Sequence, residues 1–90
     1  MNDKTEEALG ILQEECAEVI VEVSKIRRFG LNTQHYKTGQ PHREMLETEI
    51  GDVLALVDIL KDQCIITEEG LAKAVQAKKD KLKKWSKLYE

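Results

Sequence analysis

The apolar residues of this chain recur at helical spacing, about 100° per residue, over three segments. In the first, residues 5–28, one side of the helix would carry Ala8, Leu12, Val19, Val23 and Ile26. The second, residues 42–64, has the broadest stripe: Met45, Leu46, Ile50, Val53, Leu56, Val57 and Leu60. The third runs from a cap at Thr67 to about Leu88 and has a thinner stripe: Leu71, Ala74, Val75, Leu82, Trp85 and Leu88. The pattern predicts three helices.

The residues between these segments suit helix ends. Thr5 is a predicted N-cap for the first helix, because its hydroxyl can accept a hydrogen bond from the first turn. Gly30 is expected to stop that helix. Residues 29–41 are rich in Asn, Thr and Gly and predict a loop, with Pro41 as an early position of the second helix. Thr67 should cap the third helix.

Composition favours an all-α chain. Glu, Lys, Leu, Ala and Gln dominate the 90 residues, whereas there are five Gly and one Pro. The length suits one domain, residues 1–90, with a small core. Three helices with wide apolar stripes make only half a bundle core. We therefore expect an antiparallel helical bundle that is completed by a second copy, as a homodimer or homotetramer.

No apolar run approaches the ~20 residues that span a bilayer, so no membrane association is expected. The polar, acidic N-terminus is unlike a secretory signal, which favours a cytoplasmic location and free thiols at Cys16 and Cys64. Cys16 is expected in the core. His35 and His42 have no partners at ligand spacing, so they are interpreted as loop and helix-start residues.

Charge is unevenly distributed along the chain. Residues 1–70 hold 7 Lys and Arg against 15 Asp and Glu, whereas residues 71–90 hold 7 Lys against Asp80 and Glu90. The basic third helix could bind nucleic acid, but a solvated amphipathic face is the simpler interpretation. The acidic part is more informative, because carboxylates gathered on one face require cations.

Several acids of the first helix point toward its apolar side. On a helical wheel, Glu15 and Glu22 fall in the buried sector, and Glu14 and Glu18 border it. Like charges at this spacing destabilise a helix, and unpaired buried carboxylates cost several kcal/mol. A cation is therefore expected beside them.

The second helix repeats this anomaly. Glu49 and Asp52 share its apolar side, whereas the solvated side carries Glu47, Asp58 and Asp62. Two inward acidic groups on consecutive antiparallel helices can face each other. Oxygen ligands without Cys or His select Mg²⁺, with Mn²⁺ as a substitute, over zinc.

These residues carry a resemblance to a known family. Glu14-Glu15-Cys16-Ala17-Glu18 resembles the EExxE element of the MazG-like all-α nucleoside triphosphate pyrophosphohydrolases, and Glu49-Ile50-Gly51-Asp52 resembles their ExxD element. The phrases SKIRRFGL and ETEIGDVLALVDIL look like the short MazG-like proteins of phages and bacteria. The resemblance covers roughly residues 8–85.

The resemblance implies hydrolysis of a nucleoside triphosphate to the monophosphate and pyrophosphate. It implies metal ligands among Glu14, Glu15, Glu18, Glu49 and Asp52, with Glu14 or Glu15 orienting or deprotonating the attacking water. Substrate contacts are expected from Lys25, which lies two turns beyond Glu18 on the same face, and from Arg28. Lys78 matches a phosphate-binding Lys of the family's last helix, with Lys81 and Lys83 as weaker candidates. Where that helix often has Asn, this chain has Leu82.

Three other functions remain open at this point. The related phosphoribosyl-ATP pyrophosphohydrolase of histidine synthesis shares the fold and the acids. A helical regulatory module could bind a divalent ion or a partner helix without turnover. A nucleic-acid binder would use the Lys-rich third helix.

Overall fold

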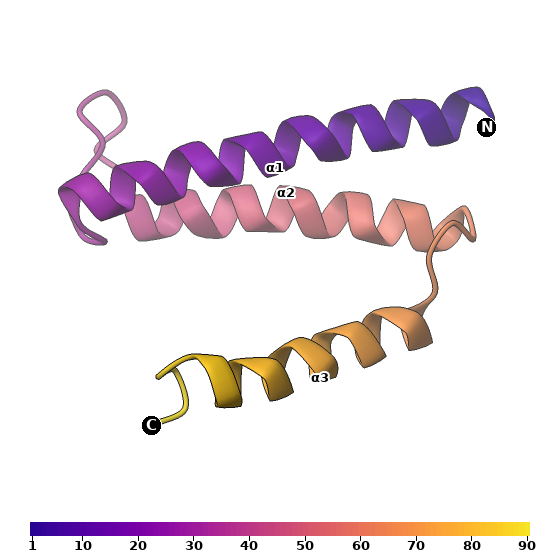
Figure 1. Ribbon diagram of the computed structural model, residues 1–90. Helices are drawn as coiled ribbons and strands as arrows, with labels where there is room; N and C mark the ends of the chain where they lie inside the picture. Colours follow the sequence, from indigo (N-terminus) through magenta and orange to yellow (C-terminus); the bar gives the residue numbers. More distant parts are fainter.

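The computed structural model describes all 90 residues and is entirely helical (Figure 1). α1 spans Asp3–Phe29, α2 spans His42–Asp62 and α3 spans Glu68–Trp85. There is no strand, and an isolated β-bridge pairs Gln34 with Pro41 in the loop that joins α1 to α2. The three predicted helices are confirmed, and none of them is long and apolar enough to cross a membrane.

The start of α1 differs from the prediction. Asn2, not Thr5, is the N-cap, because the Asn2 side chain accepts a hydrogen bond from the Thr5 backbone N–H at 2.8 Å. Thr5 lies inside the first turn, where it is buried and donates from Oγ1 to Gln63 Oε1 at 3.2 Å. Asn caps at least as well as Thr, so an Asn three residues upstream starts the helix earlier. Thr5 instead ties the beginning of α1 to the end of α2.

α2 ends two residues earlier than expected. Gln63 is its C-cap, and Cys64 adopts a left-handed conformation with φ 60°. The Cys64 N–H donates to Lys61 O at 2.9 Å, and the Ile65 N–H donates to Leu60 O at 3.0 Å. This turn satisfies the last carbonyls of the helix at a position that is usually glycine.

The ends of the other elements follow the prediction more closely. Gly30 ends α1 with φ 98°, a conformation that disfavours residues with a Cβ. Thr67 caps α3, since its side chain accepts from the Gly70 N–H at 3.0 Å. α3 ends at Trp85 rather than Leu88, and none of its residues is buried.

α1 and α2 pack side by side as an antiparallel hairpin, and α3 lies apart from them (Figure 1). The buried apolar residues are Ala8, Leu56 and Leu60, with Leu9, Leu12 and Ile66 packed against them. The molecule measures 41 × 36 × 14 Å, and 14 Å is little more than the thickness of one helix with its side chains. The helices therefore form a single layer. Much of the predicted stripe stays uncovered, including Ile50, Val75 and Trp85.

Facing residues of α1 and α2 repeat every seven positions along a line that we call the α1–α2 seam. Ala8 packs with Leu56 at the first level. Seven residues further along α1, and seven residues back along α2, Glu15 faces Glu49. One more such step brings Glu22 to His42. Since a helix rises 1.5 Å per residue, successive levels are about 10 Å apart. The seam thus changes from apolar, to acidic, to a buried acid–imidazole pair.

Candidate metal centre

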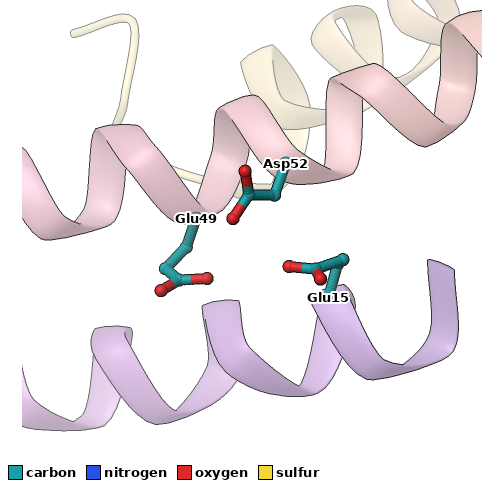
Figure 2. Close-up of side chains that lie close together, drawn as sticks. All are labelled: Glu15, Glu49 and Asp52. Atoms are coloured by element: carbon teal, nitrogen blue, oxygen red, sulfur yellow. The ribbon is translucent and has the colours of Figure 1, made fainter. Parts of the chain in front are cut away.

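Three carboxylates converge at the middle level of the seam (Figure 2). Glu15 comes from α1, and Glu49 and Asp52 come from α2. One oxygen of each lies within 4.8 Å of an oxygen of the other two. We call these residues the carboxylate trio. Glu15 and Glu49 are half-buried, whereas Asp52 is exposed on the open side.

The local structure explains why these acids meet. Glu15 and Glu49 occupy the seam positions that Ala8 and Leu56 occupy one level away, so the packing that buries the apolar pair also brings the two acids together. Asp52 follows Glu49 by three residues and shares its side of α2. The predicted outer acids, Glu47, Asp58 and Asp62, are exposed and lie outside the trio.

No basic side chain neutralises the trio. The structure has four ion pairs, and none includes Glu15, Glu49 or Asp52. Removal from water, followed by the charges of Asp52 and Glu18, raises the pKa of Glu15 above its usual 4.5. The pKa of Glu49 is raised by the same causes in the same order. Repulsion and partial burial thus favour a proton on either residue.

The trio fits a hard divalent cation. Its donors are carboxylate oxygens alone, from two elements, without Cys or His. Mg²⁺ is commonly bound through a few carboxylates and keeps other positions for water and substrate phosphates. A bound cation would also offset the charge that raises the two pKa values. The residues that would hold it are Glu15, Glu49 and Asp52.

The other two predicted ligands lie at the edge of this group. Glu18 is exposed and outside the trio, but its charge raises the pKa of both Glu15 and Glu49. Glu14 is also exposed, and its charge affects Glu15 without an effect on Glu49.

Two of the predicted substrate residues come together, and the third does not. Lys25 and Arg28 line a cavity of about 520 Å³ at the C-terminal end of α1, which we call the loop cavity. Lys78 is exposed on α3 and lies outside both this cavity and the trio. Lys83 makes a surface ion pair with Asp80 at 3.6 Å, and Lys81 is exposed.

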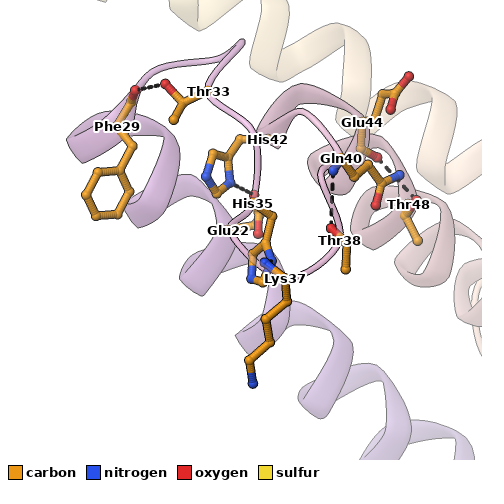
Figure 3. A network of polar contacts seen from close by, with 10 residues as sticks. All are labelled: Glu22, Phe29, Thr33, His35, Lys37, Thr38, Gln40, His42, Glu44 and Thr48. Atoms are coloured by element: carbon orange, nitrogen blue, oxygen red, sulfur yellow. Dashed lines mark hydrogen bonds and ion pairs between the residues drawn. The ribbon is translucent and has the colours of Figure 1, made fainter.

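The most buried polar contact is one that the sequence did not predict. His42 Nδ1 lies 2.8 Å from Glu22 Oε1, and both side chains are almost completely buried (Figure 3). The inward direction of Glu22 and the place of His42 at a helix start agree with the prediction, but their pairing was missed. The signal that could have found it is the spacing: each residue lies seven positions from a member of the trio, on the matching helix face.

Both cysteines are free, as expected. Cys16 is exposed, however, so its predicted placement in the core is wrong. It follows the inward-facing Glu15 by one residue, and a step of about 100° turns it away from the seam.

Comparisons with protein-family models, with curated proteins and with solved structures found no match. The function of the chain is therefore inferred from the chemistry of the trio, the cavity and the seam.

Proposed function

We propose that this protein hydrolyses (deoxy)nucleoside triphosphates to the monophosphate and pyrophosphate in a Mg²⁺-dependent reaction. The observation that carries the proposal is the convergence of Glu15, Glu49 and Asp52 without a basic partner. The resemblance of the EExxE and ExxD elements to MazG-like enzymes supports it, since the trio draws on both elements. Mn²⁺ is expected to substitute for Mg²⁺.

Glu15, Glu49 and Asp52 are the proposed metal ligands, and Glu18 completes the set from the edge. Bound Mg²⁺ would neutralise phosphate charge and make a bound water more acidic. The hairpin supplies the positioning: packing of α1 on α2 holds the acids at one level before the substrate arrives. Charge that is preorganised in this way supplies much of the rate enhancement of many enzymes.

Glu14 is the proposed proton acceptor, because the resemblance implies this role for Glu14 or Glu15, and Glu14 is exposed to water. A water oxygen forms a bond to phosphorus at the α–β anhydride as the bridging P–O bond breaks. The proton of that water passes to the Glu14 carboxylate, and pyrophosphate leaves with the bond's electron pair. Lys25 and Arg28 offset the charge of the phosphates from the loop cavity.

We propose that a second copy of the chain packs against the exposed apolar side chains of the helical layer. Ile50 and Leu54 are 42% and 56% exposed on α2, and Val75 is 53% exposed on α3. Large apolar side chains exposed in this way often mark interfaces in other proteins. A homodimer or a homotetramer would bury it. Light scattering at micromolar concentrations measures this directly, and an active monomer of 10.3 kDa would contradict it.

The same exposed apolar positions favour one alternative, a non-catalytic module that binds a cation and a partner helix. One assay separates the two. The protein is incubated with a panel of nucleoside triphosphates, deoxynucleoside triphosphates and phosphoribosyl-ATP in Mg²⁺, and pyrophosphate and monophosphate are measured. We expect both products in equal amounts with at least one substrate, and none in EDTA. Absence of turnover across the panel would favour the module.

A further inference from the structure

The loop cavity lies at the end of the α1–α2 hairpin, where the loop from residues 30–41 folds back over the helix ends (Figure 3). Its volume of about 520 Å³ is within the range of small-molecule sites. It begins at His42, one seam level, or about 10 Å, from Glu49. The trio and the cavity thus lie at neighbouring levels of the same hairpin.

Aromatic rings form much of the cavity wall. His42 stacks on Phe29 with ring centroids 6.2 Å apart, and His35 meets His42 edge-on at 6.3 Å. His35 also stacks on Tyr36 at 4.9 Å. Tyr36 is 85% exposed and Phe29 is 55% exposed, and the cations of Lys37 and Arg28 lie over these two rings at 5.6 Å and 5.1 Å. Exposed rings of this kind suit a planar aromatic group, which gains from offset stacking.

Two cations share the wall with these rings. Neither Lys25 nor Arg28 takes part in an ion pair. The Arg28 guanidinium lies 5.1 Å from the centre of the Phe29 ring, which holds it at the cavity. Unpaired cations beside open rings match a ligand that is both planar and anionic.

The back of the cavity is rigid. His42 is only 4% exposed and is held by Glu22, which is 3% exposed, through the 2.8 Å contact. The ring of His42 thus has a fixed orientation before any ligand arrives. Preorganisation of this kind reduces the entropy that binding must overcome.

We propose that the loop cavity binds the nucleobase and sugar of the nucleotide, with the phosphates directed past Lys25 toward the trio. This assignment rests on the proposed function and extends it by naming the base-recognition site. Tyr36 and Phe29 stack on the base, and Arg28 and Lys25 meet the first phosphate. The preference among bases is then set by the loop and not by the metal centre.

The two histidines of the chain both line this cavity, so their imidazole proton resonances report on its occupancy. The protein in EDTA is titrated with AMP, GMP, CMP and UMP, and with ribose 5-phosphate as the probe without a base. We expect saturable shifts of both histidines with at least one nucleotide, and at least tenfold weaker binding of ribose 5-phosphate. Equal binding of ribose 5-phosphate, or no histidine shift with any nucleotide, would overturn the assignment.

A matched pair of variants tests the stacking ring. Tyr36→Ala should weaken binding of the preferred nucleotide about tenfold, the order that one base stacked on one aromatic ring contributes. Tyr89→Ala removes the only other tyrosine, which lies near Lys83 on the C-terminal segment, and should leave binding unchanged. Circular dichroism should be the same for both, because Tyr36 is largely exposed. Unchanged affinity in Tyr36→Ala would remove the ring from the site.

Failure of this assignment and failure of the proposed function give different results. The titrations use reaction products without metal, so they require no turnover. If nucleotides bind in the cavity but no pyrophosphate is released in Mg²⁺, the binding site is supported and the proposed enzymatic function is contradicted. If the substrate is hydrolysed while the histidine resonances do not shift, the enzymatic function is supported and the base-binding site is contradicted.

Discussion

Glu22 and His42 join the two helices of the hairpin through a buried contact of 2.8 Å between Oε1 and Nδ1. They are 20 residues apart in the chain, and no other ion pair in the structure places two titratable side chains below 10% exposure. A slip of either helix by one turn would leave both groups buried without a partner. The pair therefore specifies the register in which Glu15 meets Glu49.

Loss of one partner of this pair should destabilise the fold. We expect Glu22→Ala to lower the free energy of unfolding by roughly 2–4 kcal/mol, because His42 is left buried without its acceptor. The double variant Glu22→Leu, His42→Leu should recover most of the loss, since apolar partners can replace a buried polar pair. Urea unfolding followed by circular dichroism measures both. The exposed pair Glu69–Lys73 is the control, and Lys73→Ala should change stability by less than about 0.5 kcal/mol. A single-variant loss no larger than this control would refute the role in register.

Asp52→Asn should abolish hydrolysis while helical content stays unchanged. It removes a proposed metal ligand and, with it, the preorganised charge that acts in the transition state. It also removes a charge that raises the pKa of Glu15 and Glu49, so the metal-free protein should be at least as stable as the parent. Glu47→Gln, on the exposed side of the same helix, is the control and should keep full activity. Pyrophosphate release and thermal melting in EDTA give the two readouts. Full activity in Asp52→Asn would show that the trio is not the metal centre.

The stability of the metal-free protein should decrease as the pH rises above about 4.5. Burial and neighbouring charges raise the pKa of Glu15 and Glu49, so the folded chain binds more protons than the unfolded chain just above that pH. With more protons on the folded state, the free energy of unfolding falls with increasing pH. Urea titrations in EDTA from pH 4 to 7 should show a shallower fall for Glu15→Gln than for the parent, with Glu47→Gln like the parent. Identical slopes for Glu15→Gln and the parent would argue against mutual repulsion at the trio.

Cys64→Gly should stabilise the chain by about 0.5–1 kcal/mol. Cys64 adopts a left-handed conformation that costs residues with a Cβ roughly 1–2 kcal/mol, and glycine avoids this cost. Part of the gain is offset because glycine loses more conformational entropy on folding. The matched control is Cys16→Gly, in the middle of α1, which should destabilise by roughly 0.3–0.5 kcal/mol. Thermal melting under reducing conditions compares the two variants. A loss of stability in both would mean that the α2 C-terminal turn carries no strain.

The sequence predicted the three helices and the inward direction of the key acids. Apolar periodicity and the acids of the wheel were enough to place Glu15, Glu49 and Asp52 on the facing sides of α1 and α2. The wheel placed Glu14 and Glu18 at the border of the buried sector, and the resemblance added them to the metal ligands. The structure separates them, because these two residues border the seam and remain exposed.

The misplaced residues have physical reasons. The predicted start of α1 at Thr5 is wrong because two good caps, Asn2 and Thr5, lie three residues apart, and the pattern does not rank them. The Glu22–His42 pair depends on where the loop of residues 30–41 positions the start of α2 relative to α1. The periodicity of apolar residues within one helix carries no information about that position. The separation of α3 from the hairpin likewise depends on packing between helices, which the pattern of a single helix does not describe.

The lack of any buried residue in α3 means that its order depends on its surroundings. An 18-residue helix with no buried residue is only marginally stable by itself in water. With a second copy packed against it, the helicity of α3 becomes a function of protein concentration, whereas α1 and α2 hold each other within one chain. In the proposed dimer or tetramer, dilution should therefore speed amide hydrogen exchange in α3 before it affects the hairpin.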